Sequence, residues 1–300
     1  MCDNITYPKP LKPGDKIAIV SPAGIVNPDF VHASVQVLSN EGWTPYISKH
    51  ALGKYGSFSG SISNRLEDIT NAFIDNETRA IFCSRGGYGA IHLLEGLSAL
   101  PLERDPKWLI GFSDISALHA LMTSKGIASI HAPMTKHLSR ENGTDSNSYQ
   151  LFEILRGKQP QYQWNSHTLN KCGNVSGKLV GGNLAVLQAL INTSYDIFKK
   201  GDILFIEDIG EPIYKVQRML YQLRLSGILQ SLKGLIIGQF TNYHPDANFP
   251  DMEIMISEII SPYKYPVAFN APIGHVNNNI PLIIGSEITL SVTNKITYIH

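Results

Sequence analysis

The stretch WLIGFSDISALHAL, Trp108 to Leu121, changes character at Ser113. The apolar residues before the serine predict a buried strand, and those after it follow helical spacing. A strand that ends on a serine and passes directly into a helix would hold the hydroxyl at the mouth of a sheet, where the first amides of the helix can receive an oxyanion. The alternative is that Ser113 or Asp114 only caps the helix.

The same strand, turn and helix plan occurs elsewhere in the first half of the chain. KIAIVSPAG, from Lys16, and AIFCSRGGYGAIHLL, from Ala80, both run from an apolar segment into a glycine turn. Strands that alternate with helices predict an α/β fold whose N-terminal domain is a mainly parallel, doubly wound sheet. Ligands of such sheets bind beyond the carboxyl ends of the strands, where Ser113 is expected.

The pattern of apolar and polar residues changes in the second half of the chain, which predicts a second domain. Residues 146–174 are polar with no firm period and are predicted to be a linker. Residues 175–300 combine short β-like runs with one long helical pattern, and they predict a smaller C-terminal α/β domain of mixed strands. The N-terminal domain is therefore expected to span residues 1–145.

Composition excludes several classes of protein. The chain of 300 residues has 25 Lys plus Arg and 25 Asp plus Glu, so no net field favours nucleic acid or an anionic membrane. Its start lacks a basic segment followed by a long apolar one, so we expect no signal peptide. Cys2, Cys83 and Cys172 form no C-x-x-C pair, which favours a reducing compartment and argues against a structural zinc site. We therefore expect a cytoplasmic protein.

Two further polar positions interrupt apolar runs in the second half. The strand-like ILFIED ends in Glu207 and Asp208, and His275 lies in a glycine-bounded loop after an apolar run. With Ser113 they supply a nucleophile, a carboxylate and an imidazole base, the groups needed to activate a hydroxyl. The alternatives are a solvated strand end or helix cap and a surface histidine. The chain has 10 histidines, so composition alone does not decide between them.

The segment CSRGGYGA, Cys83 to Ala90, provides candidates for substrate contacts. The adjacent Gly86 and Gly87 can bring backbone N–H groups close to a ligand and form half of an oxyanion hole. No Walker lysine and no full G-x-G-x-x-G spacing accompany them. The alternative is a tight strand-to-helix turn. Arg85 can bind a substrate carboxylate as a fork or pair with a neighbouring acid.

The chain resembles the LD-carboxypeptidases, serine peptidases that remove a terminal D-alanine from murein tetrapeptides. The resemblance covers nearly the whole chain and rests on separate blocks in the same order: LKPGDKIAIVSPAG, SRGGYGA, IGFSDISALH, GKLVGGNLAVL, LFIEDIGEPIYKVQRML and APIGHVNNNIPLIIG. Two departures affect local loop shape. His131 to Met134 reads HAPM where the family usually has HGPM, and Pro281 lies further from Gly285 than the family's proline does.

The resemblance implies a role for each candidate residue. Ser113 would be the nucleophile, Glu207 the acid and His275 the base. The amide of Asp114 and one amide from the pair Gly86 and Gly87 would form the oxyanion hole. It further implies hydrolysis of an L,D-peptide bond without a metal or other cofactor, often by a homodimer. The alternatives are hydrolysis of aminoacyl-nucleotide conjugates, as in the related microcin-immunity branch, and a non-catalytic peptide-binding protein on the same scaffold.

Overall fold

The structure, a computed structural model, describes residues 5–300 and divides into two compact units. The first unit contains the described residues up to Pro160 together with Ile280–Ile283. The second contains Gln161–Asn279 and Ile284–His300. Each unit is built around its own β-sheet.

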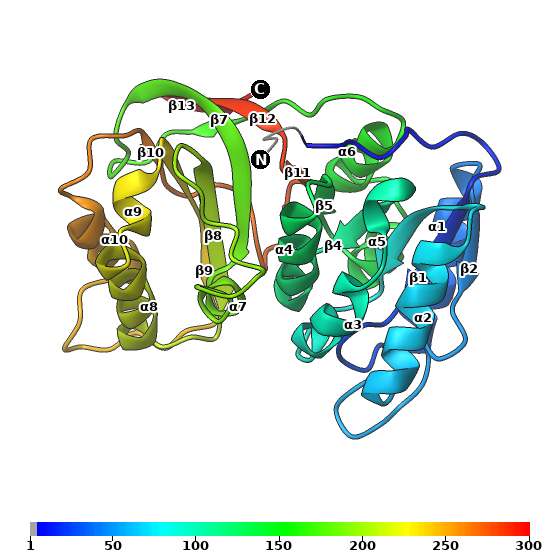
Figure 1. Cartoon of the computed structure of the whole chain (residues 1–300). Helices are drawn as coiled ribbons and strands as arrows, with labels where there is room; N and C mark the ends of the chain where they lie inside the picture. The colour runs from blue at the N-terminus through cyan, green and yellow to red at the C-terminus, as the bar shows by residue number, and fades with distance from the viewer. Residues whose placement is uncertain (1–4) are drawn as a thin grey trace. The chain divides into compact units, whose positions relative to one another are not determined.

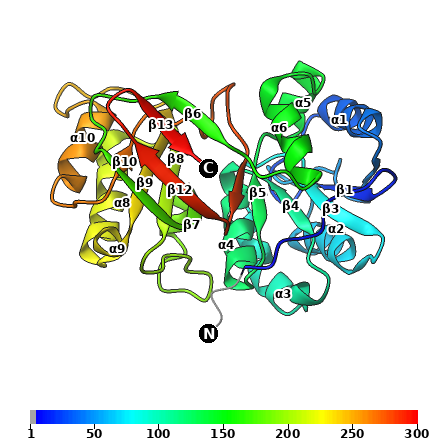
Figure 2. The same ribbon diagram turned by 90° about the horizontal axis from the view of Figure 1, so that it is seen from above.

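The first unit is a doubly wound sheet with the strand order β11-β5-β4-β3-β1-β2. The neighbouring pairs from β5 to β2 are all parallel. Figure 2 shows α1, α5 and α6 on one face of this sheet and α2, α3 and α4 on the other. The strands are β1 (Lys16–Val20), β2 (Thr44–Ile47), β3 (Thr78–Cys83), β4 (Trp108–Gly111), β5 (Ser129–His131) and β11 (Leu282–Ile284). The helices are α1 (Pro28–Asn40), α2 (Ile62–Ile74), α3 (Leu94–Ser98), α4 (Ser116–Ser124), α5 (Thr135–Glu141) and α6 (Ser146–Leu155).

Local sequence signals place several helix starts in this unit. The side chain of Asn27 accepts a hydrogen bond from Asp29 N at the start of α1, where Pro28 occupies the first turn. Ser61 accepts from Asn64 N at the start of α2. Each cap satisfies an amide that lacks a partner within the helix, so the helices begin where the sequence provides these acceptors.

The second unit has a mixed sheet with the strand order β10-β9-β8-β7-β12-β13-β6. The pairs β10–β9, β9–β8 and β8–β7 are parallel, and the pairs β7–β12, β12–β13 and β13–β6 are antiparallel. Helices α8, α9 and α10 gather beside the parallel strands (Figure 1). The strands are β6 (Tyr162–Asn165), β7 (Gly173–Asn183), β8 (Ile203–Ile209), β9 (Gly234–Thr241), β10 (Val267–Ala268), β12 (Glu287–Val292) and β13 (Ile296–Ile299). The helices are α7 (Leu184–Gln188), α8 (Ile213–Leu225), α9 (Ile228–Ser231) and α10 (Met252–Ile260).

The predicted fold class is confirmed: a mainly parallel doubly wound sheet is followed by a smaller unit of mixed strands. The segment predicted as a linker, residues 146–174, has a different structure. Its first part is α6, whose Leu151, Phe152 and Leu155 are buried in the core of the first unit. Its second part contains β6 and the start of β7. The apolar face of α6 is short, so polar residues dominate the sequence around it.

The described residues can be compared with the expectations for membrane helices and for the cysteines. Among residues 5–300, no helix combines the length and the apolar character needed to cross a membrane. Cys83 is buried and Cys172 is exposed, whereas Cys2 lies outside the described residues. Burial raises the pKa of the Cys83 thiol, which therefore remains protonated.

Candidate active site

The turn after β4 holds Ser113 in a conformation that side chains rarely adopt. Ser113 has a φ of +66°, in the left-handed region, and the chain passes from it through a short 3-10 turn into α4. The positions that precede the 3-10 turn and α4 are Phe112 and Ile115, and neither makes a side-chain capping bond. The left-handed backbone of a non-glycine residue is strained, and such strain concentrates at functional sites.

Gly86 lies directly against this serine. A Cβ atom at position 86 would be 3.0 Å from Ser113 Oγ, 2.9 Å from Ser113 Cβ and 3.2 Å from Asp114 N. Gly87 requires glycine for another reason, since its φ is +111°. The loop after β3 therefore brings backbone, with no side chain between, to the serine and to the first amide after it.

The side chain of Asp114 contacts the segment after the glycine pair and not the start of α4. Its Oδ2 accepts a hydrogen bond of 2.8 Å from Ala90 N, in the segment that follows the glycine pair. The carboxyl is buried, and burial raises its pKa, although the hydrogen bond from Ala90 favours the charged form. Asp114 thus joins the turn after β4 to the loop after β3.

A buried histidine that the sequence analysis did not single out lies behind the serine turn. His119, on α4, donates from Nε2 to Gly111 O at 2.8 Å, so its Nδ1 accepts from Ser129 Oγ at 2.8 Å. Burial lowers the pKa of His119 from 6.5 to about 4, so the ring is neutral near pH 7. It joins β5 to the last residue of β4, two residues before Ser113.

Arg85 is exposed and does not pair with an acid among residues 5–300. Its Nη1 donates to Ile25 O at 2.5 Å, in the loop after β1. Arg85 therefore does not form the ion pair within its own loop that was one of its two interpretations. The remaining donors of the guanidinium are available to a substrate carboxylate.

Glu207 and His275 meet in the second unit. Glu207 is fully buried near the end of β8, and its Oε2 lies 2.8 Å from His275 Nδ1. Glycine provides the room for this carboxylate, because a Cβ at Gly274 would be 2.8 Å from Glu207 Oε2 and one at Gly238 3.2 Å from Glu207 Cβ. A buried carboxylate on Nδ1 fixes the imidazole with Nε2 directed away from it.

The neighbouring carboxylate, Asp208, has a different set of partners. It accepts hydrogen bonds from Asn183 Nδ2 at 3.0 Å, Ala185 N at 2.9 Å and Ile209 N at 2.8 Å. Burial raises its pKa to about 6, even though the three donors favour the charged form. Asp208 therefore ties β8 to the start of α7, and of the two carboxylates that end ILFIED only Glu207 contacts the histidine.

Asn279 is a second residue that the sequence analysis missed. Its Oδ1 accepts from Gly274 N at 2.9 Å, and the residue is buried. This bond closes the loop that carries His275. The available signal was the asparagine run after the histidine, since asparagine side chains commonly bond nearby backbone in loops.

The predicted site residues therefore form two groups. Ser113, Asp114, Arg85 and the glycine pair belong to the first unit, where Gly86 adjoins both Ser113 and Asp114. Glu207 and His275 belong to the second unit and contact each other.

Comparison with known proteins decides the family. Residues 17–132 match the LD-carboxypeptidase N-terminal domain, and residues 176–290 match the LD-carboxypeptidase C-terminal domain. The chain belongs to the LD-carboxypeptidase family. As an LD-carboxypeptidase it is a serine-type carboxypeptidase, a hydrolase. The murein tetrapeptide carboxypeptidase of Pseudomonas aeruginosa is 30% identical, with 88% of this chain and 89% of that protein covered.

Solved structures share the fold of this LD-carboxypeptidase over almost its entire length. The muramoyltetrapeptide carboxypeptidase of Oxalobacter formigenes has a TM-score of 0.85 and 27% identity, with 95% of this chain and 97% of that chain covered. The microcin C7 self-immunity protein also has a TM-score of 0.85, at 21% identity, with 97% of each chain covered. The second similarity is one of fold alone.

Proposed function

We propose that this LD-carboxypeptidase hydrolyses the L,D-peptide bond that joins the terminal D-alanine to a murein tetrapeptide, as part of cell-wall recycling. The observation that carries the proposal is Ser113, held at a φ of +66° at the carboxyl end of a parallel strand with Gly86 against its side chain. Relatives that are named for murein tetrapeptides support the substrate class.

In the proposed reaction Ser113 Oγ attacks the carbonyl carbon of the scissile bond. His275 accepts the hydroxyl proton through Nε2 and returns it to the amine of the leaving D-alanine. Glu207 holds Nδ1 and stabilises the imidazolium that forms. Water then attacks the acyl-enzyme through the same histidine, and the tripeptide leaves with Ser113 restored.

The negative charge that develops on the carbonyl oxygen requires N–H donors. The amide of Asp114 and an amide from Gly86 or Gly87 are the proposed donors. A Cβ at position 86 would be 3.2 Å from Asp114 N, so the backbone of Gly86 runs past this amide. Removing one such donor typically lowers kcat about 100- to 1000-fold. We assign Arg85 to the free carboxylate of the terminal D-alanine.

The setting of the enzyme is also part of the proposal. We place it in the cytoplasm, because its scattered cysteines are compatible with a reducing compartment. The proposed mechanism uses protein groups alone, with no metal or cofactor, and nucleic acid and membranes are not proposed as partners. We propose a homodimer as the assembly, which light scattering of the purified protein measures directly.

The decisive experiment incubates the purified enzyme with murein tri-, tetra- and pentapeptides and follows the products by mass. The expected result is release of D-alanine from the tetrapeptide, with no release by Ser113→Ala. Two alternatives predict other outcomes. Hydrolysis of aminoacyl-nucleotide conjugates in place of the tetrapeptide would assign the chain to the microcin-immunity branch. Tetrapeptide binding without any turnover would identify a non-catalytic peptide-binding protein.

A further inference from the structure

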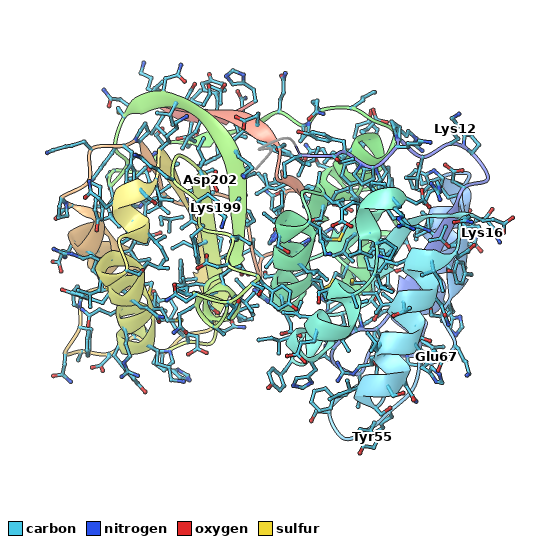
Figure 3. All side chains as sticks on the ribbon, in the orientation of Figure 1. Lys12, Lys16, Tyr55, Glu67, Lys199 and Asp202 are labelled. Carbon is cyan, nitrogen blue, oxygen red and sulfur yellow. The ribbon has the colours of Figure 1, made fainter. Side chains whose placement is uncertain are left out.

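Arg65 is a buried cation on α2, a helix on which Glu67 is exposed and Asp68 is also buried. Arg65 itself is 2% exposed. Glu67, two residues later, points away from the helix toward solvent, as Figure 3 shows. Burying a guanidinium is unfavourable unless hydrogen bonds replace its water. The contacts of Arg65 therefore need an explanation.

The guanidinium binds backbone carbonyls of three different loops. Nη1 donates to Pro22 O at 2.6 Å, in the loop after β1, and to Gly89 O at 2.9 Å, in the loop after β3. Nε donates to Gly60 O at 3.1 Å, in the loop before α2. A further contact of 3.3 Å joins Nη2 to His92 Nδ1. Arg65 has no ion pair among residues 5–300, so it acts on the backbone and not on a single acid.

Arg65 and Asp114 both bind the peptide group between Gly89 and Ala90. Gly89 O accepts from Arg65, and Ala90 N, the other end of the same peptide group, donates to Asp114 Oδ2 at 2.8 Å. A positive group therefore binds the oxygen of this peptide and a carboxylate binds its N–H, which matches the peptide dipole at both ends. The backbone amide of Asp114 is itself one of the proposed oxyanion donors.

Glycine at position 89 is required for this arrangement. Gly89 has a φ of +114°, and a Cβ there would be 3.0 Å from Arg65 Nη1 and 2.8 Å from a ring carbon of Phe58. The same Phe58 ring lies under the guanidinium, 4.9 Å from Arg65 Cζ to the ring centroid. The guanidinium, the ring and the peptide thus pack without space for a side chain at position 89.

We propose that Arg65 is a positioning residue for the oxyanion hole, a role that rests on the proposed function. By holding the Gly89–Ala90 peptide, it fixes the glycine pair after β3 relative to Ser113 and the amide of Asp114. Oxyanion donors stabilise the transition state only when they are fixed before the reaction. Loss of Arg65 therefore lowers kcat and leaves binding of the ground-state peptide nearly unchanged.

The test compares Arg65→Met and Arg65→Lys with a matched control, Lys107→Met. Lys107 is also a buried cation of the first unit, and its Nζ donates to a backbone carbonyl, that of Asp75. It precedes β4, at the strand end opposite Ser113. For each folded variant kcat is measured on the tetrapeptide, and peptide affinity is measured by calorimetry in a Ser113→Ala background.

We expect kcat of Arg65→Met to fall about 10- to 100-fold, less than for removal of a donor, with affinity within about threefold. Arg65→Lys keeps the charge but cannot reach three carbonyls, so its kcat should be intermediate, and it remains informative if Arg65→Met does not fold. Lys107→Met should keep its kcat.

Three results would overturn the inference: unchanged kcat in a folded Arg65 variant, a loss confined to affinity, or an equal loss of kcat in Lys107→Met. Undiminished turnover by Ser113→Ala would instead overturn the proposed function, and the inference with it. An inactive Ser113→Ala beside an Arg65→Met variant of normal kcat would overturn the inference alone. The two failures are thereby distinguishable.

Discussion

Glu207 Oε2 lies 2.8 Å from His275 Nδ1, and the carboxylate that makes this contact is fully buried. Water cannot substitute for the carboxylate at this position. The carboxylate, at a strand end, therefore orients the imidazole, which a glycine loop carries. Because water does not screen this charge, we expect Glu207 to affect the imidazole more strongly than an exposed acid in the same strand would.

We expect Glu207→Gln to lower kcat about 100- to 10,000-fold with little change in KM. The amide fills nearly the same space but removes the charge that stabilises the imidazolium in the transition state. The measurement is steady-state kinetics on the tetrapeptide. Glu258→Gln, an exposed acid on α10, is the control and should retain full activity. An active Glu207→Gln enzyme would mean that another group orients the base.

Gly274→Ala should disturb the same pair through space. Its Cβ would lie 2.8 Å from Glu207 Oε2, and the φ of +115° adds strain. The matched control is Gly227→Ala, where φ is +78° but no atom lies within 4 Å of the new Cβ. Both variants should lose about 1–2 kcal/mol from the left-handed backbone, and only Gly274→Ala should also lose kcat, by about 10-fold or more. Equal kcat values in the two variants would contradict the steric argument.

Ser113 should show its backbone strain in stability measurements. Ser113→Ala and Ser113→Gly should both be folded and inactive. Because φ is +66°, the glycine variant should be the more stable by about 1 kcal/mol in chemical denaturation. At Ser39, an exposed residue of α1, the same two substitutions should rank in the opposite order, since alanine favours helix by about 1 kcal/mol. Matching orders at the two sites would remove the evidence for strain.

His119 should make the stability of the enzyme depend on pH. The pKa of His119 is lowered from 6.5 to about 4 in the folded protein, so the unfolded chain binds a proton first as the pH falls. This contribution is fully present above pH 6.5 and is lost progressively between there and about pH 4, to a total of the order of 3 kcal/mol. His119→Gln cannot titrate. The difference in unfolding free energy between the two proteins should therefore change across this window and be constant above it.

Local sequence was sufficient for many elements of the first unit and for the serine turn. Apolar periodicity predicted the alternating strands and helices of the first half, because most of these elements bury an apolar face. The interruption of an apolar strand by Ser113 also indicated the turn. The helix α6 was missed because its buried side combines the polar Asn147 and Ser148 with the apolar residues Leu151, Phe152, Ile154 and Leu155.

The supporting residues of the site depend on contacts between distant segments, which periodicity does not encode. Arg65 and Glu67 are both charged residues within one helical pattern, and packing alone buries the first. A signal was present, since Arg65 lies four residues before Ile69 on the apolar side of α2. Glu207 and Asp208 were likewise equivalent in sequence, and the three donors around Asp208 come from two separate segments.

Arg85 provides a test of how the enzyme distinguishes a chain end from a chain interior. The chemical difference is one free carboxylate, and Arg85 precedes the glycine pair that adjoins Ser113. Its Nη1 donates to Ile25 O, and it has no acid partner among residues 5–300. The other N–H groups of the planar guanidinium can therefore still make a bidentate contact with a carboxylate. The unmodified enzyme should therefore cleave the tetrapeptide acid much faster than the tetrapeptide amide.

In Arg85→Lys the charge remains but the fork is lost, so kcat/KM on the acid should fall about 10-fold. The rate on the amide should change little, because the amide never made the charged contact, and the preference for acid over amide should shrink accordingly. Arg218→Lys is the matched control, since Arg218 is an exposed arginine of the second unit that lies over the Tyr214 ring on α8. Equal cleavage of acid and amide by the unmodified enzyme would exclude carboxylate recognition. Normal discrimination by Arg85→Lys together with its loss in Arg218→Lys would move the contact to α8.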